Sequence, residues 1–146
     1  MDHEYKPILK KKMPILLFDG HCNLCNAWVR FIVKRDSSKI IRFASLQSTV
    51  GRQMLEVHKI DTNYVDSLVL FEEEKYFVSS TAALKVLAYL SGWERYFQFL
   101  VLVPRPFRDI VYRLVANNRY KWFGRREKCM IPTPELIDRF LPDRSQ

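Results

Sequence analysis

The chain has 146 residues, enough for one domain to bury a core without disulfide staples. Hydrophobic residues make up 48% of it and charged residues 27%, which is ordinary for a globular protein and excludes a low-complexity chain. The formal net charge of +8 favours encounters with acidic partners, nucleic acid or anionic lipid, although it says nothing about the fold. Aromatic residues reach 14% and lie mostly in the second half, so we expect an interior and one exposed face rich in rings.

Two apolar runs are candidates for a leader or a membrane segment. Residues 13–18 are six positions long, whereas a signal peptide needs roughly 7–15 apolar residues. Residues 97–103 are far shorter than the roughly 20 residues of a membrane span. We therefore expect a cytoplasmic protein without a membrane span, in a compartment that keeps thiols reduced.

The first half of the chain reads as alternating strands and helices. Residues 1–12 are polar and unpatterned, which predicts a flexible tail before a single domain over residues 13–142. The four elements expected next are a buried strand at 13–18, a helix from Cys22 to about residue 35, a strand at 40–46 and a helix at 48–58. The change from a continuous apolar run to helical spacing marks the end of the first strand.

The second half begins with a hairpin and continues as helices. Strands at 68–71 and 76–78 are separated by a charged gap of hairpin length. Ser79-Ser80-Thr81 is expected to cap the following helix. Further helices are predicted at 93–103, 108–120 and 135–140, and residues 103–142 form a helical C-terminal extension.

This order of elements predicts an α/β fold of the thioredoxin-like kind. A leading βαβ unit implies parallel pairing with a right-handed crossover, and the hairpin then adds an antiparallel edge. Cys22 falls at the C-terminal end of the first strand, where open α/β sheets usually place their active sites.

Cys22 and Cys25 form a Cys-x-x-Cys pair at this strand-to-helix junction. The unpaired N–H groups and the dipole of a helix N-terminus favour a thiolate at Cys22, so its pKa is expected to fall. Cys25 lies one turn further along the same face, within bonding reach of Cys22. We expect an exposed Cys22 that attacks a disulfide and a partly covered Cys25 that resolves the intermediate.

A zinc site is the main alternative, together with a basic interaction module that has no catalytic activity. Structural zinc needs two ligands beyond the cysteine pair. The candidates are Cys129, His3, His21 and His58, and they form no second close pair. The redox interpretation is therefore favoured, and it requires no cofactor and no metal.

Three residues next to the pair are candidate site residues. Asp19 is either a carboxylate that takes up the proton of Cys25 or a turn former that bonds loop amides together with Gly20. His21 either lowers the pKa of Cys22 when protonated or lies in solvent, and the passive role is favoured.

Two basic segments, Lys10–Lys12 and Arg119–Lys128, are either solvated surface or docking sites. A third hypothesis is that they bind nucleic acid or a membrane surface, of which nucleic acid is not favoured. Cys129 lies in the second segment's basic setting, and it is either a third redox thiol or a buried packing residue.

The segment Asp19-Gly20-His21-Cys22-Asn23-Leu24-Cys25 resembles the Asp-x-x-Cys-x-x-Cys signature of the DCC family of thiol–disulfide oxidoreductases. The likeness extends over roughly residues 13–142 and includes residues 41–47, 79–83 and 118–124, and Cys129 in its Cys-Met-Ile-Pro setting. The resemblance implies a thioredoxin-like fold and dithiol–disulfide exchange with a thiol or disulfide substrate, protein or small molecule, and an electron donor.

One departure from thioredoxin itself concerns the third strand. Thioredoxin has a proline, normally cis, before that strand and facing the cysteine pair, whereas this chain has Tyr64-Val65-Asp66-Ser67 there. We expect Asp66 or Ser67 to take the proline's position.

Overall fold

The computed structural model of the chain describes residues 13–37, 39–61, 68–90, 92–125 and 139–140. Its elements in chain order are β1 (Ile15–Phe18), α2 (Asn23–Arg35), β2 (Arg42–Ser45), α3 (Thr49–Val57), β3 (Leu68–Glu72), β4 (Lys75–Val78), α4 (Ser79–Leu87), the 3₁₀ helix η2 (Trp93–Leu102), α5 (Arg105–Asn117) and α6 (Arg119–Phe123). Up to α4 this is the predicted order.

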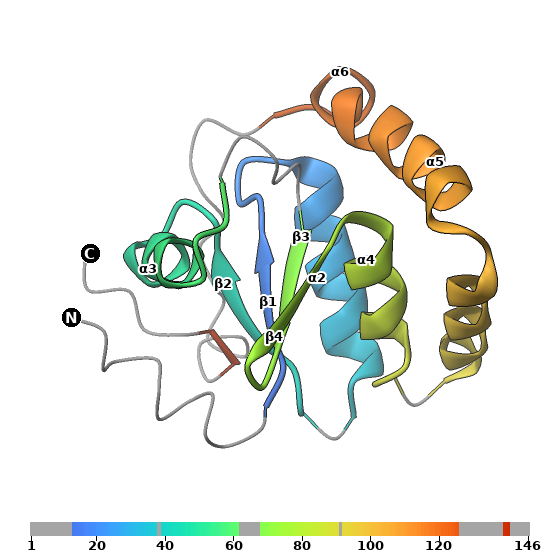
Figure 1. Ribbon diagram of the computed structural model, residues 1–146, viewed down its shortest axis with the longest axis horizontal. Coiled ribbons are helices and arrows are strands. Elements are labelled where there is room, and N and C mark those ends of the chain that lie inside the picture. The colour runs from blue at the N-terminus through green and yellow to red at the C-terminus, as the bar shows by residue number, and fades with distance from the viewer. Residues whose placement is uncertain (1–12, 38, 62–67, 91, 126–138, 141–146) are drawn as a thin grey trace.

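The four strands form one sheet in the order β2-β1-β3-β4 (Figure 1). Strand β1 pairs in parallel with β2, so that Leu16 lies opposite Phe43. Strand β3 is antiparallel both to β1 and to β4, with which it forms the hairpin. The βαβ unit and the closing hairpin confirm the predicted thioredoxin-like fold.

The sheet separates two apolar layers, and β1 contributes to both because successive side chains of a strand face opposite sides. Leu16 and Phe18 are buried in the larger layer, beneath α2 and α4. Ile15 and Leu17 are buried in the smaller layer, where they pack with Met54 of α3. Figure 1 shows α3 on one face of the sheet and α2 and α4 on the other. This fully buried central strand ends directly at the cysteine motif.

The chain after α4 forms a further helical layer on the outside of α2 and α4 (Figure 1). Helix α4 packs against η2 and α5, and α2 packs against α6. Polar side chains join the first turns of α4 and α5. Ser80 Oγ donates to Asp109 Oδ1 at 2.5 Å, and Arg108 Nη1 donates to Thr81 Oγ1 at 3.3 Å.

These contacts explain why the predicted cap of α4 is wrong. The N-cap position is Val78, and no side chain hydrogen-bonds the first amides of the helix. The hydroxyls of Ser80 and Thr81 bond to residues of α5 instead of capping their own helix.

The helix predicted for residues 93–103 is present, but Trp93–Leu102 has 3₁₀ rather than α geometry. Although η2 packs against α4, its large apolar side chains are exposed and only Glu94 is buried, so no buried apolar stripe stabilises α-helical geometry. Helix α5 begins at Arg105, earlier than predicted, since Pro106 lies in its first turn, where a missing N–H costs nothing.

The described end of the chain returns to the edge of the sheet. Arg139 forms a buried ion pair with Asp36, whose carboxylate also accepts the Ile41 N–H at 2.9 Å. The ring of Phe140 lies 5.8 Å from that of Phe43 on β2. The remainder of the helix predicted at 135–140 lies outside the described residues. None of the helices in the described ranges is long and apolar enough to cross a membrane.

Candidate functional site

Cys22 lies at the junction between β1 and α2, as the spacing predicts. It is the N-cap residue of α2, with an extended backbone at φ −89° and ψ 121°. Its sulfur accepts the backbone N–H of Cys25 at 3.4 Å. A side chain that accepts an amide at this position satisfies one of the unpaired donors of the helix terminus. The geometry therefore directs helix N–H groups at the Cys22 sulfur. Both cysteines are free thiols.

The two thiols have opposite pKa shifts with a common cause. The side chain of Cys25 hydrogen-bonds to the Cys22 sulfur and lowers the pKa of Cys22 to about 6. Burial opposes this shift, while the backbone amides of Cys25 and Leu24 and the charge of Arg119 support it. The same hydrogen bond raises the pKa of Cys25, and burial and the charges on Cys22 and Asp19 raise it further. At neutral pH the pair holds a thiolate on Cys22 and a proton on Cys25.

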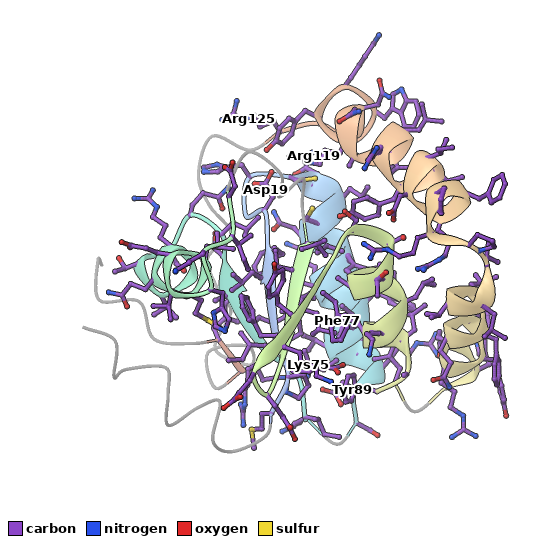
Figure 2. The ribbon with its side chains drawn as sticks, in the orientation of Figure 1. Asp19, Lys75, Phe77, Tyr89, Arg119 and Arg125 are labelled. Carbon is purple, nitrogen blue, oxygen red and sulfur yellow. The ribbon has the colours of Figure 1, made fainter. Side chains whose placement is uncertain are left out.

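Asp19 follows β1 and is a buried carboxylate with four donors. Its Oδ1 accepts the His21 N–H at 3.0 Å and Gln47 Nε2 at 2.9 Å. Its Oδ2 accepts the Tyr120 hydroxyl and Arg119 Nη2, the latter at 3.3 Å. Burial works against ionisation, but the Tyr120 bond and the other three donors hold the pKa of Asp19 below its usual value. Figure 2 shows Asp19 and Arg119 together at the end of the fold where α6 lies.

Three of these partners were not predicted from the sequence: Gln47, Arg119 and Tyr120. They lie 28, 100 and 101 positions from Asp19, so the spacing of the motif carries no information about them. The available signal was the resemblance, because residues 41–47 and 118–124 both resemble the DCC family. Gln47 is itself oriented by Ser45, whose Oγ donates to Gln47 Oε1 at 2.6 Å.

The prediction that Cys22 is exposed is wrong, because its exposed fraction is 0%. The segment after α6 covers it, forming an isolated antiparallel bridge between Cys22 and Arg125. Asn23 secures this cover, since its Nδ2 donates to the Phe123 carbonyl at 2.9 Å. Gly124 has φ +88°, and a Cβ there would lie 2.9 Å from Asn23 Nδ2. Cys25 is 5% exposed, which is more covered than predicted.

The other predicted site residues divide into two groups. Gly20 supports the loop, because its N–H donates to Gln47 Oε1 at 3.1 Å and its carbonyl accepts Asn26 Nδ2 at 3.1 Å. His21 is half-buried, and its backbone N–H is one of the Asp19 donors. Asp66, Ser67 and Cys129 lie outside the described residues, so their predicted places in the site stay predictions.

A cavity of about 160 Å³ lies beside Cys25, between α2, α4 and α5. Its walls are Leu24, Cys25, Trp28, Leu68, Ala83, Tyr112, Val115, Ala116 and Arg119. Apolar cavities of about 150 Å³ hold a benzene-sized group. The site therefore has room for one apolar group next to the pair.

Within the described ranges, no three side chains of His, Cys, Asp or Glu come close enough to hold a metal ion together. Four of the zinc candidates, Cys22, Cys25, His21 and His58, are in those ranges, whereas Cys129 and His3 are not. Cys22 and Cys25 therefore form a pair of thiols joined by a hydrogen bond.

Comparisons with known proteins agree with this geometry. The family model of the DCC1-like thiol-disulfide oxidoreductases matches residues 16–125. The chain is 48% identical to "Uncharacterized protein YuxK" of Bacillus subtilis (strain 168), over 88% of this chain and 93% of that protein. It is 40% identical to "DCC family protein At1g52590, chloroplastic" of Arabidopsis thaliana, over 81% of this chain and 69% of that protein. No solved structure matches the chain.

Proposed function

Because the chain belongs to the DCC1-like thiol-disulfide oxidoreductase family, we propose that it exchanges disulfides with a protein or small-thiol substrate through Cys22 and Cys25. The observation that carries the proposal is the position of the Cys22 sulfur at the N-cap of α2, where it accepts the Cys25 N–H at 3.4 Å. A thiolate is the reactive form of cysteine, and a helix N-terminus stabilises it.

The first step is attack of the Cys22 thiolate on one sulfur of a substrate disulfide. The S–S bond of the substrate breaks, its second sulfur leaves as a thiolate, and a mixed disulfide forms between Cys22 and the substrate. The pKa of about 6 keeps Cys22 ionised at neutral pH. The leaving thiolate takes its proton from water.

The second step is attack by Cys25 on the Cys22 sulfur, which releases the remaining substrate thiol and forms the Cys22–Cys25 disulfide. The hydrogen bond to Cys22 is the largest cause of the raised pKa of Cys25, followed by burial and by the negative charge on Cys22. Once Cys22 is in a mixed disulfide, its charge and the hydrogen bond to its thiolate are gone, so Cys25 loses its proton to water more easily. The substrate thiolate that leaves takes up a proton in turn. The two electrons given to the substrate must return from an external dithiol donor, which regenerates both thiols.

Asp19 acts mainly by positioning and by its charge. Its lowered pKa makes the carboxylate a weak proton acceptor, so the turn-forming role with Gly20 carries more of its function than proton uptake. Its negative charge helps to keep Cys25 protonated until Cys22 has reacted. Its bonds to Arg119 and Tyr120 join α6 to the cysteine loop.

Substrate access requires the segment around Gly124 and Arg125 to move, because this segment covers Cys22. The backbone bond between the Asn23 N–H and the Gly124 carbonyl is long, at 3.5 Å, so it resists this movement weakly. The cavity beside Cys25 then receives an apolar group of the substrate near its disulfide.

The experiment is a disulfide-reduction assay on the wild type and on Cys22→Ser and Cys25→Ser, with insulin or glutathione disulfide as substrate and a small dithiol as donor. We expect Cys22→Ser to be inactive and Cys25→Ser to stop at the mixed disulfide. A Cys22→Ser variant with undiminished activity would refute the proposal.

A further inference from the structure

The outermost helical layer exposes an unusual number of large apolar side chains. We use the name outer face for the exposed apolar surface of η2, α5 and α6, represented by Trp93, Phe99, Leu102, Phe107, Ile110 and Trp122. Leu102 is 83% exposed and Phe107 66%. Figure 2 shows side chains of η2 and α5 projecting away from the rest of the fold. Contiguous exposed apolar patches on a protein surface mark interaction sites.

Helix α5 shows that the outer face is separate from the packing of the fold. Its inward side contains Tyr112 and Ala116, which contribute to the core and to the cavity wall. Phe107, Ile110, Val111 and Leu114 are exposed and follow the spacing i, i+3, i+4, i+7. That spacing places them on one stripe of the helix, turned away from the inward side. The fold therefore does not use this stripe.

The charges on these helices have one sign at the surface. Residues 93–125 contain seven basic residues and two acidic ones. Neither acidic residue is exposed: Glu94 is buried and pairs with Arg35 at 3.0 Å, and Asp109 is half-buried, accepts the Ser80 hydroxyl and pairs with Arg105 at 3.9 Å. The exposed charges of the segment are all positive, on Arg95, Arg105, Arg113, Lys121 and Arg125.

The exposed apolar side chains and the positive charges of the outer face together distinguish between possible binding partners. A second copy of the chain would bring the same positive charges against each other, which is unfavourable. A nucleic acid would pair with the arginines but would leave the aliphatic residues of α5 in water. An anionic bilayer matches both features, because acyl chains accept the apolar side chains and lipid headgroups pair with the flanking basic residues.

We propose that the outer face adsorbs to anionic lipid membranes, with η2 and α5 lying in the plane of the headgroups. This inference is independent of the proposed redox function. The described helices are too short and too little apolar to cross a bilayer, so the interaction is peripheral. Trp93 and Trp122 are exposed and are the residue type that anchors proteins at the headgroup level. Helix α6 also carries Arg119 and Tyr120, so adsorption places the dithiol end of the fold near the surface.

The test uses the full chain and two vesicle preparations, phosphatidylcholine alone and phosphatidylcholine mixed with phosphatidylglycerol. Binding is measured by co-sedimentation and by the tryptophan emission maximum. We expect binding to the mixed vesicles and a blue shift of the tryptophan emission. We also expect most of the binding to be lost in high salt, because salt screens the attraction between the basic side chains and the anionic headgroups. Binding to phosphatidylcholine alone is expected to be much weaker.

Matched variants separate the face from the rest of the surface. Arg113→Gln with Lys121→Gln is expected to weaken binding to the mixed vesicles roughly thirtyfold, since each basic residue near an anionic surface contributes about 1 kcal/mol. Leu102→Ser with Phe107→Ser is expected to weaken it at least about tenfold. The control pair is Arg52→Gln with Val57→Ser on α3, both exposed on the opposite side of the sheet, and it should bind as the wild type does.

Several outcomes would overturn the proposal: no binding to mixed vesicles, equal binding to both vesicle types, or variants of the outer face that bind as the wild type does. A stable dimer that forms without lipid and is lost in Leu102→Ser with Phe107→Ser would assign the face to a second copy instead. Salt-sensitive retention on DNA or RNA without vesicle binding would assign it to nucleic acid. If a variant fails to fold, the dependence of wild-type vesicle binding on salt and on lipid composition tests the proposal by itself.

Discussion

The hydrogen bond between the two thiols can be tested by changing only its donor. The Cys25 side chain is the largest cause of the lowered pKa of Cys22, which is about 6. A hydrogen bond to a charged group contributes about 1.5–3 kcal/mol, which corresponds to about 1 to 2 pH units in the acceptor's pKa. Cys25→Ala is therefore expected to raise the pKa of Cys22 by that amount. Cys25→Ser keeps a donor at the same place and is expected to leave the pKa of Cys22 closer to that of the wild type.

The measurement is the ultraviolet absorbance of the thiolate as a function of pH, on reduced protein that also carries Cys129→Ser, so that no third thiol contributes. This absorbance does not depend on access, so the burial of Cys22 does not distort it. The backbone N–H of Cys25 donates to Cys22 in all three proteins and cancels in the comparison. An equal pKa of Cys22 in the alanine and serine variants would refute the reasoning, because the thiol of Cys25 would then not be the donor that matters.

Three further predictions concern the cover, the buried carboxylate and the pH dependence of stability. Asn23→Ala removes the hydrogen bond to the Phe123 carbonyl, which contributes about 1 kcal/mol, and should speed alkylation of Cys22 roughly fivefold. An unchanged alkylation rate, measured by mass spectrometry, would contradict the role of Asn23 in holding the segment after α6 over Cys22. Asp19→Ala leaves a largely buried guanidinium without its partner and should cost about 3 kcal/mol of unfolding free energy in urea, whereas Tyr120→Phe should cost about 1 kcal/mol; equal costs would be unexpected. The pKa of Cys22 is lowered in the folded state from 9.0 to about 6, so its contribution to stability is fully present above pH 9 and is lost as the pH falls through about 6. The difference in unfolding free energy between the wild type and Cys22→Ser should therefore increase as the pH rises from about 6 to 9. A difference that is constant with pH would be inconsistent with a native thiolate.

The sheet and its helices could be predicted because each has a local pattern. The buried run ending at Phe18 and the helical spacing after Cys22 define the first strand and helix, and the preference for right-handed crossovers leaves few topologies for the rest. The cysteine pair could be located for the same reason, since its spacing and its place at the junction are properties of seven consecutive residues.

The surroundings of the pair could not be predicted, because they come from distant parts of the chain. Tyr120 and Arg119 reach Asp19 from about a hundred positions away, and no periodicity records such a contact. The burial of Cys22 depends on the bridge to Arg125, which directly follows α6, a helix that packs on α2. The 3₁₀ geometry of residues 93–102 likewise follows from the exposure of the segment's apolar side chains, which its composition does not reveal.

The central claim is that Cys22 attacks and Cys25 resolves, and trapping of the intermediate tests it most directly. Reduced wild type, Cys22→Ser and Cys25→Ser are each treated with glutathione disulfide, and the products are mapped by mass spectrometry of the intact protein and its peptides. We predict a stable glutathione adduct on Cys22 in Cys25→Ser, an internal Cys22–Cys25 disulfide in the wild type, and no rapid adduct in Cys22→Ser. A stable adduct on Cys25 in Cys22→Ser, formed as fast as the wild type is oxidised, would contradict the account.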